Sequence, residues 1–269
     1  MLSLLAGRPT HPAFRIYHLA WQAADWLFPP ECAGCGKFGY RWCNACEEDI
    51  HAIHPPFCQI CNQEVQKAGI CGNCKSEQPA FTMLRSLGSY SGSLRNAVLK
   101  IKYKHDVGVC EIFAFKLLNL VESNKWNIDK VVAVPLNPQH LRSRGYNQAE
   151  LLAKPLSWLL NTPLANEAVT RTKQTMSQVG LSADQRKLNV ENAFMADPAV
   201  VSGNNILLVD DIATTCSTLN ECSKALKSAG AKNVFAVTLA RAILSQDTVE
   251  HLRSLGYFSN PHISTLSGG

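Results

Sequence analysis

Eight of the eleven cysteines fall in one stretch, residues 32–74, as four Cys-x-x-Cys pairs. The pairs are Cys32/Cys35, Cys43/Cys46, Cys58/Cys61 and Cys71/Cys74. Disulfide frameworks rarely repeat this pair, whereas zinc ribbons do, because each pair supplies half of the thiolates that a tetrahedral Zn²⁺ needs. The spacing predicts two structural zinc ions, with one zinc ion as the alternative. With cysteine at all four positions of each site, no position remains for a catalytic water.

The pairs that share a metal are not fixed by the spacing. Sequential pairing, first with second and third with fourth, is the simplest arrangement, and crossed pairing is the alternative. The surrounding residues 29–79 are short of apolar side chains and would not fold on a hydrophobic core alone. We therefore expect a small zinc-ribbon domain with four cysteine ligands to each metal ion, stabilised by those ions.

The clustered cysteines also indicate the cellular compartment of the protein. The first residues lack a basic n-region, and no run approaches the roughly 18 apolar residues of a membrane span. Clustered metal-binding thiols require reducing conditions. We expect a cytoplasmic protein without an integral membrane segment.

Residues 80–245 alternate between helical and strand patterns. Apolar residues recur at helical spacing over 94–101 and 109–122. Short continuous apolar runs, typical of buried parallel strands, occur at 130–136, 205–211 and 233–241. This alternation predicts an α/β domain with a mostly parallel sheet flanked by helices.

The two ends of the chain carry weaker patterns. Residues 1–28 finish in a helical pattern with four apolar residues on one face, Leu19, Ala23, Trp26 and Leu27. We expect this face to pack against the rest of the chain, with partner docking as the alternative. The composition of residues 246–269 is typical of disorder.

The stretch ILLVDDIATTCSTL, residues 206–219, predicts a ligand site. Its apolar start leads to the carboxyl end of a buried strand, where α/β sheets bind ligands. Asp210 and Asp211 come next, and both reach one ligand only if the strand ends there. The turn and helix N-terminus that follow suit a phosphate, with hydroxyl donors at Thr214, Thr215, Ser217 and Thr218. Ribose 5-phosphate fits both halves, since the acids accept hydrogen bonds from the sugar hydroxyls.

Three further segments accompany this stretch: VVAVPL at 131–136, RSRGYNQAELLAKPL at 142–156, and VTRTKQTMSQVGLSADQRKLNVENAF at 169–194. ILLVDDIATTCST resembles the phosphoribosyl-pyrophosphate (PRPP) motif of type I phosphoribosyltransferases. With four cysteine pairs in front, residues 25–241 resemble the ComF/GntX family of competence and DNA-utilisation proteins. The resemblance implies a type I phosphoribosyltransferase-like parallel sheet preceded by a double zinc ribbon.

The resemblance also implies roles for individual residues. It puts Asp210 and Asp211 on the ribose, and it surrounds the 5′-phosphate with Ala213, Thr214, Thr215, Cys216, Ser217 and Thr218. Residues 136–148 would handle pyrophosphate, with Arg142 and Arg144 as anion ligands; a solvated basic loop is the alternative. Residues 171–190 correspond to a loop that closes over the site. Position 216 is commonly glycine in this motif, and a cysteine there is strained if its φ is positive.

The implied reaction is pentosyl transfer, in which pyrophosphate leaves C1 of PRPP with the help of Mg²⁺. No residue identifies the acceptor, and the resemblance alone does not establish catalysis. The family instead implies a factor in the uptake or use of extracellular DNA, with DNA-uptake machinery as partners. A PRPP-dependent salvage enzyme and a non-catalytic zinc-ribbon adaptor are the alternatives.

Single-stranded DNA is a further expected partner. Net charge is only +5, so a nucleic-acid surface requires local clustering. Residues 78–105 contain no acid, and they carry five cations: Arg85, Arg95, Lys100, Lys102 and Lys104. Together with Tyr103, they suit a single strand, and a solvated helix face is the alternative.

Overall fold

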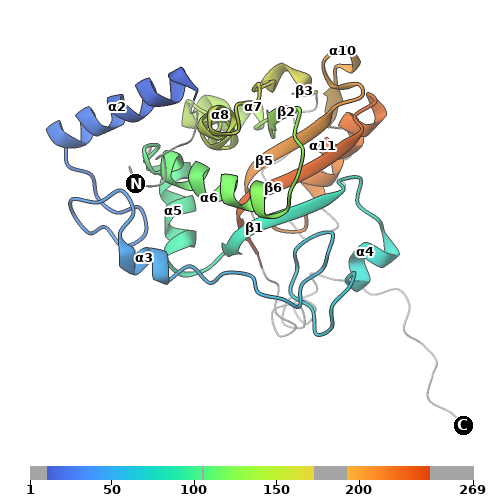
Figure 1. Ribbon diagram of the computed structural model, residues 1–269, viewed down its shortest axis with the longest axis horizontal. Helices are drawn as coiled ribbons and strands as arrows, with labels where there is room; N and C mark the ends of the chain where they lie inside the picture. Colours follow the sequence, from blue (N-terminus) through green and yellow to red (C-terminus); the bar gives the residue numbers. More distant parts are fainter. Residues whose placement is uncertain (1–10, 105, 173–192, 243–269) are drawn as a thin grey trace, which may run out of the picture.

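The computed structural model describes residues 11–104, 106–172 and 193–242 (Figure 1). The expected disorder of residues 246–269 falls outside these ranges, as does most of the segment 171–190 that was expected to close over the site. No helix in the described part of the chain is long and apolar enough to cross a membrane.

A four-stranded, fully parallel sheet forms the centre of the molecule. Its order is β1 (Met83–Ser89), β6 (Asn233–Arg241), β5 (Asn205–Ala213) and β2 (Lys130–Ala133). The three apolar runs form β2, β5 and β6, which confirms the predicted parallel α/β sheet. Strand β1 was not predicted, because Arg85 and Ser86 interrupt its apolar pattern although both are buried.

Helices cover both faces of this sheet (Figure 1). One side carries α5 (Gly92–Tyr103), α6 (Val109–Ser123) and α8 (Gln148–Leu160). The other carries α11 (Ser217–Ser228) and a two-stranded antiparallel sheet, β3 (Val169–Arg171) with β4 (Phe194–Ala196). Strand β5 supplies the centre of the core, since Ile206, Leu207, Leu208 and Val209 are all fully buried.

The remaining described elements are short. They are α3 (Asn44–Glu48), α4 (Gly72–Ser76), α7 (Pro138–Arg144), the 3-10 turn η1 (Asn166–Ala168) and α10 (Pro198–Val201). Helices α3 and α4 each begin directly after the first cysteine of a pair, with Cys43 and Cys71 as their N-caps. The chain therefore turns back toward the metal-binding sulfurs within one helical turn.

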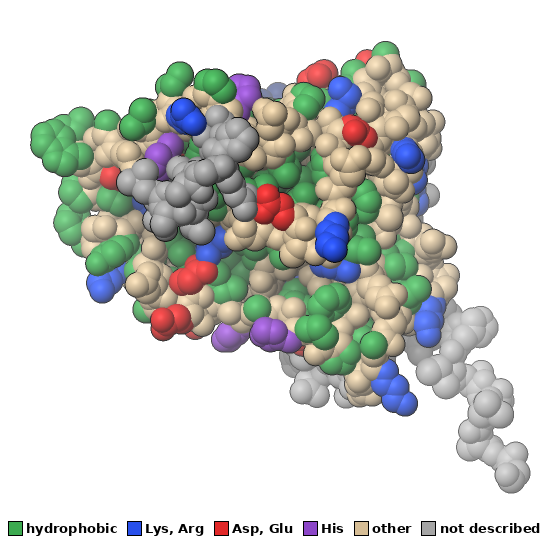
Figure 2. Space-filling view, viewed as in Figure 1, with side chains coloured by type: hydrophobic (Ala, Val, Ile, Leu, Met, Phe, Trp, Pro, Cys, Tyr) green, Lys and Arg blue, Asp and Glu red, His purple; other side chains and the backbone are tan. Residues whose placement is uncertain are grey.

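Helix α2 (Pro12–Leu27) packs through the face opposite to the predicted one. Its buried residues are Phe14, whose ring meets Phe115 edge-on at 5.4 Å, and His18, which contacts Glu111. The expected inward residues are exposed, at 61% for Leu19, 83% for Trp26 and 61% for Leu27, and Ala23 is exposed as well. Figure 2 shows hydrophobic side chains on the surface at this end of the molecule. The prediction was wrong because aromatic rings and a buried hydrogen bond, rather than the aliphatic stripe, hold this helix.

Candidate functional site

The eight paired cysteines form two separate clusters. The first cluster is Cys32, Cys35, Cys43 and Cys46, and the second cluster is Cys58, Cys61, Cys71 and Cys74. Within each cluster the sulfur atoms lie within 4.8 Å of one another, so sequential pairing is the arrangement that the fold adopts. The sulfur separations of 3.6 Å for Cys32–Cys46 and 3.7 Å for Cys61–Cys71 match a tetrahedron of thiolates. Its edges are about 3.8 Å for Zn–S bonds of about 2.3 Å.

The local backbone favours a thiolate at one cysteine of each cluster, while burial raises the pKa of other cysteines in both clusters. Burial raises the pKa of Cys32, but hydrogen bonds from the backbone N–H groups of Cys35, Cys43 and Gly34 outweigh it and lower that pKa to about 7. The same balance lowers the pKa of Cys58 to about 7. Since a thiolate is the form that binds metal, both clusters fit structural zinc ions.

The first cluster is joined to α5. The ammonium of Lys100 donates to the Cys32 carbonyl at 2.8 Å, and the Ser93 hydroxyl donates to the Cys46 carbonyl at 2.9 Å. The backbone N–H of Ser93 donates to Asp49 at 2.7 Å, so the ribbon also caps the start of this helix. Any shift of the first ribbon would therefore be transmitted to α5.

The second cluster is joined to the outer edge of β1. The backbone N–H of Leu84 donates to the Ile60 carbonyl at 2.7 Å, and that of Ser86 donates to the Asn62 side chain at 2.8 Å. Arg85 adds a bond to the Gln59 carbonyl at 3.1 Å. The ribbon thus satisfies donors that an edge strand would otherwise leave open to other chains.

The acid pair lies on β5, which continues to Ala213 instead of ending at the two aspartates as expected. Neighbouring strand residues point to opposite faces. Asp211 is accordingly buried toward α5, where Lys102 Nζ lies 2.8 Å from its carboxylate. Asp210 is half-buried and accepts a hydrogen bond from the Asp211 N–H at 2.8 Å. Burial, followed by the charge of Asp211, raises the pKa of Asp210 well above its usual range.

Basic side chains from three elements lie near this pair. Lys102 comes from α5, Arg144 from α7 and Arg171 from β3, and the imidazole of His140 on α7 lies near these cations. Burial, then the charges of Arg144, Arg171 and Lys102, lower the pKa of His140. Burial also lowers the pKa of Arg171, and the charge of Asp210 opposes that shift. The site therefore combines two carboxyl groups with a concentration of cations, which suits a ligand that carries both hydroxyls and phosphates.

The two predicted arginines of α7 differ in their surroundings. Arg144 is half-buried, stacks its guanidinium over the Tyr103 ring at 5.0 Å and donates to Gln148 at 3.1 Å. Arg142 is exposed. Helix α7 ends at Gly145, whose φ of 79° is the left-handed conformation that glycine adopts without strain. This turn puts Arg144, rather than Arg142, beside Lys102.

The predicted phosphate loop joins β5 to α11. Its residues Ala213 and Cys216 are buried, while Thr214, Thr215, Ser217 and Thr218 are half-buried. The hydroxyl groups of Thr215 and Ser217 are hydrogen-bonded to each other at 2.8 Å. Cys216 is the N-cap of α11 and has a φ of 64°, so this position does require the left-handed conformation that the usual glycine provides.

The expected DNA-binding stretch is largely engaged within the fold. Lys100 and Lys102 hold Cys32 and Asp211 respectively, and Arg85 is buried under the second ribbon. The other two cations of the stretch, Arg95 and Lys104, are exposed, and Tyr103 is 55% exposed. Three of the five cations thus have partners within the fold, and single-stranded DNA binding stays a prediction.

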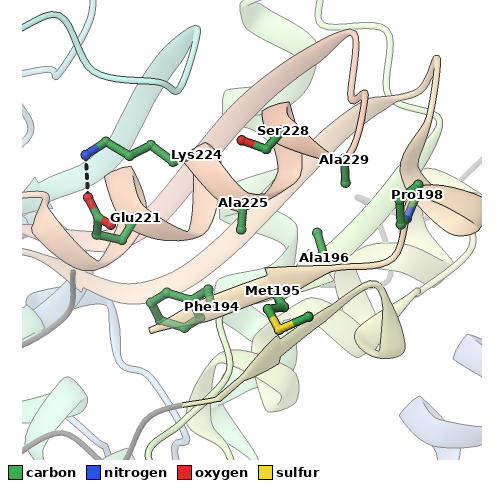
Figure 3. A pocket seen from close by; sticks show the side chains of 9 residues that line it. All are labelled: Phe194, Met195, Ala196, Pro198, Glu221, Lys224, Ala225, Ser228 and Ala229. Carbon is green, nitrogen blue, oxygen red and sulfur yellow. Dashed lines mark hydrogen bonds and ion pairs between the residues drawn. The ribbon is translucent and has the colours of Figure 1, made fainter. Parts of the chain in front are cut away.

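A pocket of about 320 Å³ lies away from the acid pair, between β4 and α11 (Figure 3). Its apolar wall includes Phe194, Ala196 and Ala225, and the ion pair of Glu221 with Lys224, at 2.6 Å, lies at one end. None of the predicted site residues lines it. It is therefore separate from the predicted ribose-phosphate site.

From the sequence, Lys102 was assigned to DNA binding and Arg241 was given no role, whereas His140 and Arg171 fell within the predicted segments 136–148 and 171–190. A signal existed for Lys102, which follows Val98 by one helical turn and so falls on the buried face of α5. Arg241 ends an otherwise apolar strand and is only 5% exposed. A lysine or arginine at a position that the sequence pattern predicts to be buried implies an ion-pair or hydrogen-bond partner, but the pattern does not identify that partner.

Comparison with known proteins agrees with this architecture. Residues 23–75 match the model of the double zinc ribbon domain, and residues 116–253 match that of the phosphoribosyl transferase domain. Competence protein F of Haemophilus influenzae is 35% identical over 211 residues, which span 74% of this chain and 90% of that protein. DNA utilization protein YhgH of Escherichia coli K12 is 29% identical, spanning 75% and 97% of the two chains.

Competence protein ComFC of Bacillus subtilis is 26% identical over 237 residues, which span 83% of this chain and 90% of that protein. The two family models together cover both cysteine clusters and the strands β2, β5 and β6. With its double zinc ribbon and phosphoribosyltransferase-type domain, the chain belongs to the ComF/GntX family.

Proposed function

We propose that this protein is a cytoplasmic factor in the uptake or use of extracellular DNA that binds PRPP in a phosphoribosyltransferase-type site. One observation carries the proposal. The acid pair on β5 meets Lys102, which lies near Arg144, at the end of a parallel sheet and immediately before a loop that opens α11. The names of the relatives, competence and DNA utilization proteins, support the biological part.

Each end of PRPP has a complementary region in this proposal. The 5′-phosphate lies in the loop of residues 213–218, against the helix N-terminus. The ribose hydroxyls donate to the Asp210 carboxylate, and Asp211 takes part through Lys102 or directly. The pyrophosphate lies toward Arg144 and Arg142, because planar guanidinium groups bind phosphate oxygens in pairs.

The chemistry proposed is substitution at C1 of the ribose. The bond from C1 to pyrophosphate breaks, and an acceptor forms the new bond to C1. Asp210 and Asp211 stabilise positive charge that develops near C1, while Lys102 and Arg144 stabilise negative charge on the departing pyrophosphate. Magnesium, when bound with PRPP, supplies further positive charge to the phosphate oxygens.

Calorimetric titration with Mg²⁺ and PRPP tests the proposal. We expect heat with the natural protein and a loss of affinity of about a hundredfold in Asp210→Asn, since a charge-assisted hydrogen bond is lost. Glu167→Gln, which changes an exposed acid on η1, is the matched control. Absence of heat with the natural protein would exclude PRPP binding. Binding of PRPP by a protein that has no affinity for DNA would instead favour a salvage enzyme.

Single-stranded DNA binding is proposed as a second activity. Exposed Arg95, Tyr103 and Lys104 on α5 and its C-terminal end support it, since an aromatic ring and cations suit stacking and phosphate contacts. We expect binding at low salt, and Lys104→Ala should reduce the slope of log affinity against log salt by about one. Lys75→Ala, a change on the zinc ribbon, is the control. A protein that binds neither DNA nor PRPP would be a zinc-ribbon adaptor.

A further inference from the structure

We propose that Arg241 is a positioning residue that couples the second zinc cluster to the loop of residues 213–218. Zinc bound by Cys58, Cys61, Cys71 and Cys74 then maintains the shape of this loop. The inference rests on the proposed function, because it concerns the region assigned to the 5′-phosphate. It assigns a role in that site to a metal ion that lies outside it.

One buried guanidinium contacts both regions. Arg241, the last residue of β6, is 5% exposed. Its Nε donates to the carbonyl of Cys61, a residue of the second cluster, at 3.2 Å. Its Nη1 donates to the carbonyl of Ala213 at 3.0 Å and also to that of Thr214. A single rigid group therefore connects the metal-binding turn to the start of the loop.

The bonds to the loop set the direction of its amides. Each peptide unit is planar and trans, so its N–H points opposite to its carbonyl. With the carbonyls of Ala213 and Thr214 directed at Arg241, the N–H groups of Thr214 and Thr215 are directed away from it. This is the orientation that an anion-binding turn requires, because its donors must converge on the ligand rather than on the core.

The other end of the connection depends on metal. Hydrogen bonds to β1 hold Ile60 and Asn62 on either side of Cys61. The segment of Cys71 and Cys74, however, is tied to Cys58 and Cys61 through the sulfur cluster and through one backbone bond, from the Gln59 N–H to the Gly69 carbonyl at 3.0 Å. Without zinc, four thiols remain in close contact with no ion to hold them, so the Cys61 side chain loses its anchor and only the hydrogen bonds of its neighbours hold the turn that presents its carbonyl.

The first cluster provides an internal control. Its hydrogen bonds to α5 run through Lys100, Ser93 and Asn96, and it also contacts α6 through the ion pair of Glu47 with Lys116. No hydrogen bond given by the described residues joins it to the loop 213–218. The inference therefore predicts different consequences when each zinc ion is lost.

The first experiment compares Cys71→Ser with Cys35→Ser, which each remove one ligand from one cluster. Zinc content, hydrogen exchange of the amides in residues 213–218 and PRPP affinity are measured. We expect Cys71→Ser to accelerate exchange and weaken PRPP binding, each by about tenfold, and Cys35→Ser to leave exchange of the loop unchanged. Equal exchange of the loop in the two variants would overturn the inference.

If loss of the second zinc ion unfolds the chain, substitution of Arg241 still tests the coupling between the second cluster and the loop. Arg241→Lys preserves the charge but replaces the planar group that spans Cys61 and Ala213 with a single ammonium. We expect it to retain two zinc ions while loop exchange accelerates about tenfold. Loop exchange like that of the natural protein would overturn the coupling. If the natural protein does not bind PRPP, the proposed function fails, yet the exchange comparison still decides this inference.

Discussion

The ammonium of Lys102 lies 2.8 Å from a carboxylate oxygen of Asp211, and both side chains are largely withdrawn from water. The pair joins α5 to the central strand β5 at the candidate site. Since α5 is also held by the first zinc ribbon, one helix connects a metal cluster to the acid pair. Removal of either partner leaves an uncompensated charge in a poorly solvated position.

Breaking this ion pair should destabilise the protein strongly. We expect Lys102→Met and Asp211→Asn each to reduce the free energy of unfolding by about 3–5 kcal/mol, and the double variant to recover much of that loss. Urea denaturation of the four proteins measures the coupling. Additive effects of the two substitutions would show that the ion pair does not contribute as a unit.

Asp210 should reduce stability at neutral pH while it serves the ligand site. Burial and Asp211 raise its pKa above the ordinary 3.8, so the folded state holds its proton more tightly than the unfolded state. Stability is therefore lost as pH rises from about 4 through the raised pKa. We expect Asp210→Asn to have a higher Tm than the natural protein at pH 7, and the difference to shrink toward pH 4. A Tm difference that does not vary with pH would contradict this assignment.

We expect two zinc ions per chain. Substitution of a cysteine in one cluster should remove only the zinc ion of that cluster. Metal analysis should give two equivalents for the natural protein and one for Cys35→Ser, because sequential pairing confines each ligand to one cluster. A chelator should lower the unfolding temperature as both ions leave. Cys110→Ser, at a buried cysteine outside the clusters, is the control for metal content. A single equivalent in the natural protein would refute the two-site assignment.

Gly108 is predicted to be required where α2, the first ribbon and α6 meet. A Cβ at this position would overlap the guanidinium of Arg41, which pairs with Asp25 and stacks over the Trp21 ring at 4.3 Å. We expect Gly108→Ala to lower the free energy of unfolding by about 1–2 kcal/mol as these contacts are displaced. Gly72→Ala is the matched control, since open space surrounds that position. Equal stability of the two variants would show that Arg41 moves at no cost.

The left-handed backbone at Cys216 should discriminate between substitutions. Because β-branched side chains are strained at a φ of 64°, we expect Cys216→Val to be less stable than Cys216→Gly by about 1–2 kcal/mol. Thermal unfolding measures this order. Cys222→Val, on the regular helix α11, separates the effect of added volume from that of backbone strain. The reverse order at position 216 would imply that packing outweighs the backbone there.

The local sequence pattern was sufficient to predict those features that depend on residues close together in the chain. The cysteine pairs specify knuckles because two thiolates three residues apart reach one metal ion. The apolar runs of β2, β5 and β6 specify buried parallel strands, and the order of acids, hydroxyls and helix specifies the loop before α11. The glycine that is usual at position 216 raised the question of a positive φ there, and the structure answered it with a φ of 64°.

Tertiary structure alone decided the contacts between distant segments. A lysine in a basic stretch has the same local pattern whether it faces DNA or a buried acid, and only the packing of α5 on β5 directs Lys102 to Asp211. The inward face of α2 was equally undetermined, since a buried His18–Glu111 contact outweighs an aliphatic stripe. Arg241 joins Cys61 to Ala213 only because β6 ends between the second ribbon and the loop. Such partners depend on which surfaces meet in three dimensions, and sequence periodicity does not record that.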